Sequence, residues 1–204
     1  IPVDKISSGK MGTTVATNAL LERKGDRTLL LITKGFGDWL RIGYQNRPLL
    51  FDLNINLPEL LYDRVVEVSE RLDANGNVLK HLNEKEVRAS LKKAKIDGID
   101  SVAIAFMHSY INPNHEDKIA KIAEEENYSQ ISVSHKVSPL IKLVGRGDTT
   151  VVDAYLSPIL RRYVNQVSEE LKSSKSTKLM FMQSNGGLTD ANLFQGKDAL
   201  LSGP

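Results

Sequence analysis

The stretch TLLLIT, residues 28–33, is a continuous apolar run closed at each end by a threonine. A short apolar run of this kind predicts a strand that is buried on both faces of a parallel sheet. The run SVAIAF, residues 101–106, has the same character, and residues 131–134 and 178–183 predict two further short strands. We therefore expect a largely parallel sheet.

Segments with helical spacing of apolar side chains separate these strands. From Gly12, the sequence GTTVATNALLERKG predicts a helix with Thr13 or Thr14 as its N-cap and Gly25 as its left-handed end. Residues 83–86, Asn-Glu-Lys-Glu, have the spacing of a capping box. Each of these features marks a helix end by its local chemistry.

Two later segments predict further helices. Asn112 and Pro113 form a cap and a first-turn proline for a helix that runs to about residue 126. A long helix is predicted over residues 148–172, in which Pro158 should kink the helix or split it in two. Its apolar face includes Tyr155, Ile159 and Tyr163, which we expect to pack on the sheet.

A β-hairpin is predicted in the middle of the chain. Residues 63–72 alternate apolar and polar side chains, Asn75 and Gly76 suit a tight turn, and residues 78–79 return as a second strand. Strands that alternate with helices indicate an α/β fold, with a mixed, mostly parallel sheet, flanking helices and one β-hairpin. One compact unit and two closely packed lobes both fit this pattern.

Composition excludes several classes of protein. The 204 residues carry a formal net charge of +2, without the basic stripe that nucleic-acid binding requires. No apolar run approaches the roughly 18 residues that span a bilayer, so neither a nucleic acid nor a membrane is expected as a partner. The absence of cysteine excludes disulfides and thiolate sites and fits a reducing compartment.

The two ends of the sequence suggest a piece of a longer polypeptide. The first residue is Ile1, without a targeting segment after it, and the last residues enter a Ser-Gly-Pro turn. The alternative is a small complete protein that has been processed or tagged.

Two polar segments are candidate ligand loops. Residues 9–14, GKMGTT, resemble a phosphate loop in composition but lack the spacing GxxxxGK[ST], and local chemistry alone favours a simple helix cap. Arg41, Gln45, Asn46 and Arg47 crowd a second loop, where guanidinium groups could clamp a carboxylate or phosphate. Ordinary solvated arginines are the alternative for this loop.

Histidines and glycines supply the remaining candidates. None of the four histidines forms an HxH or HExxH pattern, which argues against a zinc site. His108 lies just beyond the strand predicted at residues 101–106, at the carboxyl end where α/β sheets place ligands. The sequence QSNGG, residues 183–187, also follows a strand and is explained either by a ligand loop or by a plain strand-to-helix turn.

Taken together and in order, several of these segments resemble the amino-terminal region of the hydantoinase A/5-oxoprolinase family. The resemblance covers most of the chain and rests on the following stretches: GTTVATNALLERKG from Gly12, TKGFGDWLRIGYQNRPLLFDL from Thr33, LYDRVVEV from Leu61, MHSYINPNHE from Met107, SHKVSPLIKLVGRGDTTVVDAYLSPIL from Ser134, MQSNGGL from Met182 and LLSGP from Leu200.

The resemblance implies a ribonuclease-H-like lobe of an actin-like ATPase. It implies an ATP- and Mg-dependent cytoplasmic enzyme that phosphorylates an amide oxygen before opening a cyclic amide, together with a hydantoinase-B-type subunit or domain. The whole chain, 1–204, would belong to the N-terminal region, with residues 200–204 beginning the hydantoinase A core domain. The family's phosphate loops would lie outside the chain, so the isolated piece is expected to be inactive.

Seven residues are carried over as candidates for binding the substrate. The resemblance and the local chemistry together select Gly12, Thr13, Thr14, Arg41, Gln45, Arg47 and His108. We expect the first three and the arginine loop to line one cleft in the intact enzyme. Two alternatives stay open, a subunit of a related ATP-dependent ketone carboxylase and a non-catalytic regulatory module of the same fold.

Overall fold

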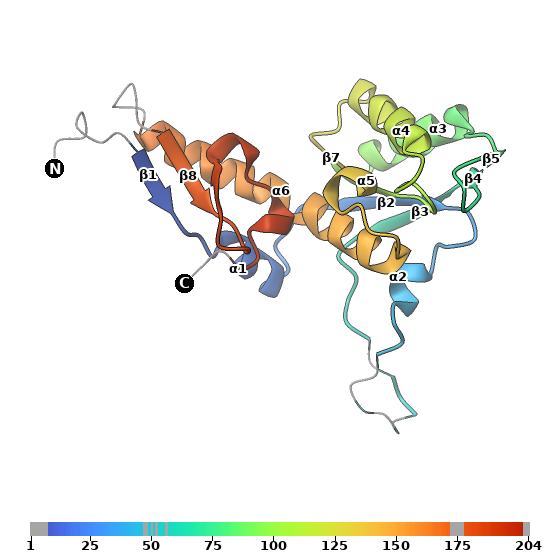
Figure 1. Ribbon diagram of the computed structural model, residues 1–204, viewed down its shortest axis with the longest axis horizontal. Helices are drawn as coiled ribbons and strands as arrows, with labels where there is room; N and C mark the ends of the chain where they lie inside the picture. The colour runs from blue at the N-terminus through green and yellow to red at the C-terminus, as the bar shows by residue number, and fades with distance from the viewer. Residues whose placement is uncertain are drawn as a thin grey trace. The chain divides into compact units, whose positions relative to one another are not determined.

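The described residues divide into two units that are joined by one long helix. The computed structural model describes residues 8–46, 49, 51, 53–55, 57–171 and 178–201. Unit 1 consists of Ile1–Asp26 with Val152–Pro204, and unit 2 is Arg27–Val151. Helix α6 (Leu143–Leu171) begins in unit 2 and ends in unit 1 (Figure 1).

Unit 2 is built on a four-stranded parallel sheet. Its strands, in the order β3-β2-β6-β7, are β3 (Arg64–Val68), β2 (Thr28–Thr33), β6 (Ser101–Ala105) and β7 (Gln130–Val133). All residues of the two central strands are buried, as the two apolar runs in the sequence predict. The predicted parallel sheet is confirmed.

Helices cover this sheet on both faces. The helices of unit 2 are α2 (Trp39–Ile42), α3 (Glu84–Ile96), α4 (Asn114–Glu125), α5 (Ser134–Val137) and the first part of α6. Figure 1 shows α3 and α4 together on one side of the strands. The main core lies there, between strand residues such as Leu31 and Ile104 and helix residues such as Leu91 and Ile119.

The predicted cap is confirmed for α3, whereas α4 begins one residue later than expected, with Pro113 and not Asn112 as its N-cap. The side chain of Asn83 accepts a hydrogen bond from the backbone N–H of Glu86 at 3.4 Å, and its amide donates to the Glu86 carboxylate at 3.2 Å. At the start of α4, Asn112 Oδ1 accepts from the N–H of Asn114 at 3.1 Å. Both helices therefore begin where side-chain oxygens satisfy free N–H groups.

The predicted hairpin is present around its turn, but its first arm is shorter than expected, because residues 64–68 form the parallel strand β3 and only Arg71–Leu72 pair in the hairpin. Strand β4 (Arg71–Leu72) pairs with β5 (Val78–Lys80) in antiparallel orientation, and Gly76 has a φ of +84° in the turn between them. Asp73 fixes this turn, since one of its carboxylate oxygens accepts from the N–H groups of Asn75 and Asn77, each at 2.8 Å.

Unit 1 holds a second sheet, in the order β1-β8-β9. Its strands are β1 (Ser8–Met11), β8 (Lys178–Met182) and β9 (Leu188–Asp190), and its helical segments are α1 (Val15–Leu21), the later part of α6, η2 (Ala191–Leu193) and η3 (Gly196–Asp198). Phe181 lies at the centre of this unit, stacked on Phe194 at 5.1 Å and edge-on to Tyr163 at 6.3 Å between ring centroids.

Three sequence expectations for unit 1 are wrong. Residues 9–11 form part of β1, paired with β8, and not a loop. Residues 183–187 connect β8 to β9 as a second hairpin, and not as a strand-to-helix turn. The left-handed residue after α1 is Arg23, with a φ of +56°, whereas Gly25 lies under the ring of Tyr155. Close packing against Tyr155 therefore requires glycine at position 25.

The long helix differs from its prediction at both points that the structure tests. It begins at Leu143, five residues before the expected start at Asp148, and it continues through Pro158 without a break. A bend at the proline stays a prediction. Tyr155 is buried, while Ile159 and Tyr163 are half-buried. The contact of Tyr163 with Phe181 on β8 confirms packing on a sheet for Tyr163, and such packing stays a prediction for Tyr155 and Ile159. Within the described part of the chain, no helix has the length and apolar character to span a membrane.

Candidate functional site

The strand order of the unit 2 sheet reverses between β2 and β6, and the carboxyl ends of these two strands lie at that point. The chain passes from β2 to β3 on one side, and from β6 to β7 on the other. Open α/β sheets bind ligands outside the carboxyl ends of such neighbouring strands. The side chains that follow these strands are therefore the first to consider for function.

The end of β2 is connected to the first turn of α4 by a chain of buried polar groups. Thr33 Oγ1 accepts a hydrogen bond from the N–H of Met107 at 2.9 Å and donates to Glu70 Oε1. The other oxygen of Glu70 lies 2.7 Å from Nδ1 of His115. All three side chains are buried, so these contacts replace the water that each polar group would otherwise need.

A second buried carboxylate, that of Glu116, joins β6 to β7. One of its oxygens accepts from the N–H of Phe106 at 2.9 Å and from Ser134 Oγ at 2.6 Å. The other accepts from the N–H of His135 at 3.1 Å and lies 2.6 Å from that residue's Nδ1. Glu116 is fully buried, and four partners satisfy its charge.

The matching buried cation is Arg146, on α6. Its Nε donates to Ser134 Oγ at 2.9 Å, and its terminal nitrogens donate to the carbonyls of Leu140, Ile141 and Phe106. Burial lowers the pKa of this guanidinium, and the nearby charge of Glu116 opposes that shift. Arg146 therefore ties α6 and the segment before it to the carboxyl end of β6.

These three sets of contacts, which we call the carboxyl-edge network, consist of Thr33, Glu70, His115, Glu116, Ser134, His135 and Arg146. The network closes the ends of β2, β6 and β7 with internal hydrogen bonds. It holds the strand ends in register, and its polar groups are already occupied by one another.

His108 lies beside this network in an unusual backbone conformation. Its φ is +62°, which non-glycine residues rarely adopt, and its carbonyl accepts from the N–H groups of Ile111 and Asn112 in a tight turn. Its Nδ1 is buried and has no hydrogen-bond partner among the residues that the structure describes. The predicted position at the carboxyl end of β6 is therefore observed.

The loop after β2 binds a carboxylate of the same chain. Glu67 Oε1 accepts from the N–H groups of Gly35 at 2.8 Å and Gly37 at 3.0 Å. The hydrogen bonds from Gly37 and then Gly35 lower the pKa of this carboxyl group. Backbone amides that converge in this way favour an anion, and here Glu67 supplies it.

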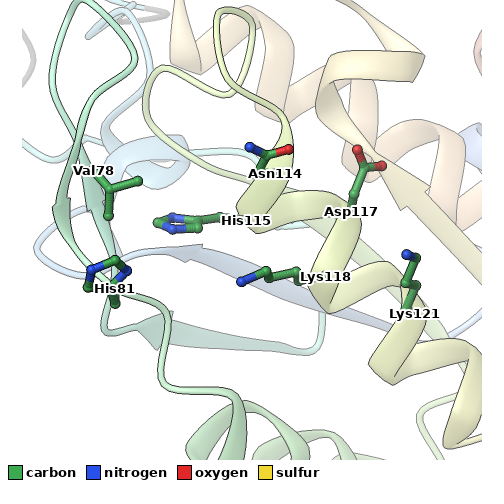
Figure 2. A pocket seen from close by; sticks show the side chains of 7 residues that line it. All are labelled: Val78, His81, Asn114, His115, Asp117, Lys118 and Lys121. Atoms are coloured by element: carbon green, nitrogen blue, oxygen red, sulfur yellow. The ribbon is translucent and has the colours of Figure 1, made fainter.

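An open pocket lies next to the network, between the hairpin and α4. Its volume is about 460 Å³. Figure 2 shows the side chains that line it: Val78, His81, Asn114, His115, Asp117, Lys118 and Lys121. Two of these are lysines and two are histidines, and His115 belongs to both the pocket and the carboxyl-edge network.

The arginine loop is only partly within the described residues. Arg41 is exposed on α2 and donates to the carbonyl of Pro58 at 2.9 Å. This hydrogen bond links α2 to the chain at residue 58. Gln45 is exposed and has a φ of +58°. Arg47 lies outside the described residues.

The glycine–threonine segment belongs to the other unit. Gly12, Thr13 and Thr14 are in unit 1, whereas Arg41, Gln45 and His108 are in unit 2. Thr13 is buried and its Oγ1 accepts from the N–H of Val15 at 3.2 Å, while Gly12 and Thr14 are exposed. Thr14 is the N-cap of α1 by position but makes no side-chain capping hydrogen bond. A role in binding a ligand stays a prediction for all three residues.

Sequence reasoning missed most of the carboxyl-edge network, although one signal was available. Glu116 occupies the same helical face as the apolar residues Ile119, Ala120 and Ala123, and a carboxylate within an apolar stripe indicates a buried, paired charge. Arg146 gives a similar signal, because this charged residue lies on the buried side of α6, one turn before the buried Thr150.

Two family models match this chain. The one described as "Hydantoinase/oxoprolinase N-terminal region" matches residues 1–127, and the one described as "Hydantoinase/oxoprolinase" matches residues 146–204. The chain belongs to the hydantoinase/oxoprolinase family. The resemblance seen in its sequence motifs is confirmed.

Relatives within this family match almost the whole chain but are much longer. The 5-oxoprolinase of Saccharomyces cerevisiae is 42% identical and covers 100% of the chain, which spans only 18% of that protein. The caprolactamase subunit alpha of Pseudomonas jessenii is 32% identical over 95% of the chain, which spans 29% of that protein. The chain therefore corresponds to a fraction of each relative.

Two solved structures share the fold. The crystal structure of the ATP-dependent caprolactamase of Pseudomonas jessenii aligns with 100% of the chain at a TM-score of 0.87 and 28% identity, and the chain covers 30% of it. A nucleotide-free acetone carboxylase aligns with 98% of the chain at a TM-score of 0.82 and 22% identity, and here too the chain covers 30%. The α/β fold with a mainly parallel sheet is thus the hydantoinase-type ATPase fold.

Proposed function

We propose that the protein containing this chain is an ATP-dependent cyclic amide hydrolase of the hydantoinase/5-oxoprolinase type. The observation that carries this proposal is the 42% identity to a 5-oxoprolinase across the whole chain. The caprolactamase supports it, since its name also describes the ATP-dependent opening of a cyclic amide. A hydantoinase-B-type partner and a cytoplasmic location belong to the same proposal.

ATP and Mg belong to this proposal, and no described residue is assigned to binding them. Among them, no group of three or more His, Asp or Glu side chains is placed to hold a metal ion. The converging amides of Gly35 and Gly37 are occupied by Glu67, and the sequence lacks the GxxxxGK[ST] spacing. We therefore assign no step of phosphoryl transfer to these residues.

The proposal is tested with the full-length protein and its partner subunit. ATP hydrolysis is measured with 5-oxoproline, hydantoin and caprolactam, and ring opening is followed in parallel. ADP formation that depends on one of the rings, with a matching amount of opened product, is the expected result. ATP hydrolysis that no ring stimulates would contradict it.

A ketone carboxylase is the second candidate, favoured by the fold shared with acetone carboxylase. The same assay distinguishes the two when acetone and bicarbonate replace the ring. Carboxylation of acetone with no opening of any ring would identify the second activity. An intact protein that hydrolyses no ATP under either condition would indicate a non-catalytic module.

A further inference from the structure

The pocket between the hairpin and α4, which we call the lysine pocket, has an excess of positive charge. Neither the side chain of Lys121 nor that of His81 makes an ion pair or hydrogen bond within the described part of the chain. Lys118 has one partner, Glu84, at 3.7 Å between Nζ and Oε1, and both side chains are more than half exposed. Such a distant, exposed pair leaves the ammonium group available to a ligand.

The single acid that lines the pocket does not cancel this charge. One oxygen of Asp117 lies 3.1 Å from Nζ of Lys136 and 3.4 Å from Nε2 of His135, neither of which lines the pocket. The negative charge of Asp117 is thus already shared with basic groups outside the pocket. The balance inside favours an anion over a cation.

His115 adds a fixed polar group to this lining. Thr33 donates to one oxygen of Glu70, and the other oxygen lies 2.7 Å from Nδ1 of His115. This contact holds the imidazole ring in one orientation and leaves Nε2 as its remaining nitrogen. Asn114 and His115 also lie in the first turn of the 12-residue helix α4, where the helix dipole favours negative charge.

We propose that the lysine pocket binds a small molecule through a phosphate or carboxylate group. The ligand's anionic oxygens would contact Lys118 and Lys121, while His81 and Val78 close the hairpin side of the pocket (Figure 2). A volume of about 460 Å³ lies within the range of pockets that hold small metabolites. This site is separate from the assignment of the reaction and stands whichever ring the enzyme opens.

The test uses lysine acetylation of the full-length protein, with inorganic phosphate or acetate as the probe. Modification of each lysine is measured by mass spectrometry as the probe is titrated. Lys118 and Lys121 should become protected, whereas Lys85 and Lys93, two exposed lysines on α3, should react at an unchanged rate. Protection by phosphate alone identifies a phosphate site, and protection by acetate as well identifies a general carboxylate and phosphate site. Equal behaviour of all four lysines would overturn the proposal.

Two sets of variants complete the test. Lys118→Gln with Lys121→Gln should weaken phosphate binding by about tenfold or more, because charge-assisted hydrogen bonds are lost, whereas Lys85→Gln with Lys93→Gln should leave it unchanged. Unchanged affinity in the Lys118/Lys121 variant would exclude the site.

Discussion

Ser134 Oγ lies 2.6 Å from the carboxylate of Glu116 and 2.9 Å from Nε of Arg146, so one hydroxyl joins a buried anion to a buried cation. The hydroxyl donates its proton to the carboxylate and accepts from the guanidinium, and these two roles use both kinds of hydrogen-bonding capacity that serine has. The two charges are therefore coupled without direct contact, and the ends of β6 and β7 depend on this serine.

Replacing this serine should destabilise unit 2. Ser134→Ala leaves Glu116 and Arg146 each without one partner in a site that water does not reach, and we expect a loss of about 1–3 kcal/mol in the free energy of unfolding. The measurement is thermal or urea unfolding of the 204-residue chain. Ser90→Ala is the matched control, because Ser90 lies on α3 and bonds only to the Glu86 carbonyl of its own helix. Equal stability of the two variants would contradict the assigned role.

The sequence predicts the sheet of unit 2 well because its strands are decided by local pattern. TLLLIT and SVAIAF form β2 and β6 with their expected burial, and Asn75-Gly76 forms the predicted turn. The strands that sequence reasoning missed, β1 and β9, are short and contain no fully buried residue, so no apolar run marks them. They form because β8 offers them backbone partners from distant parts of the chain.

The candidate site is harder to predict because its contacts also join distant parts of the chain. His108 is recognised because it directly follows a buried strand, but the contact between Glu70 and His115 joins residues that are 45 positions apart. A buried polar pair of this kind has no spacing that a single sequence shows. Gly25 illustrates the same limit, since its need for glycine comes from Tyr155, which is distant in the chain.

Two glycines of unit 1 should respond differently to alanine. A Cβ at Gly25 would lie 2.0 Å from Cε1 of Tyr155, so Gly25→Ala forces the ring to move and should cost about 1–3 kcal/mol. Gly186 has a φ of +81° with nothing within 4 Å of an added Cβ, so Gly186→Ala should cost only about 1 kcal/mol, from backbone strain. Unfolding of both variants measures the difference, and a larger loss for Gly186→Ala would be inconsistent with it.

Tyr128 should limit stability at high pH. Its hydroxyl donates to the Leu91 carbonyl at 2.8 Å, and burial, followed by the charges of Asp100 and Glu126, raises its pKa to about 12. The unfolded chain ionises this tyrosine near pH 10, so the stability that the neutral form contributes is complete below pH 10 and is lost between about pH 10 and 12.

The measurement for Tyr128 is a pair of stability profiles above pH 9, one for the natural chain and one for Tyr128→Phe. The variant should be less stable at pH 8, by about 1 kcal/mol for the lost hydrogen bond, and its stability should fall less steeply above pH 10. An absorbance titration should show one tyrosine fewer ionising near pH 12. Parallel profiles for the two chains would indicate that Tyr128 ionises normally in the folded state.

The isolated 204-residue chain should fold without binding nucleotide tightly or opening a ring. Two units with buried cores, including the fully buried strands β2 and β6, support independent folding. Activity is not expected, because the chain spans 18% of the yeast 5-oxoprolinase and its described residues include no group placed to hold a metal. Phosphoryl transfer depends on cradling phosphates and positioning metal ions, and loss of even one preorganised contact costs about 10²–10³ in rate.

Circular dichroism with thermal melting tests folding of the isolated chain, and calorimetry with Mg-ATP tests its nucleotide binding. Micromolar affinity, or turnover of 5-oxoproline or hydantoin by this chain alone, would place the nucleotide site within these residues and refute the prediction.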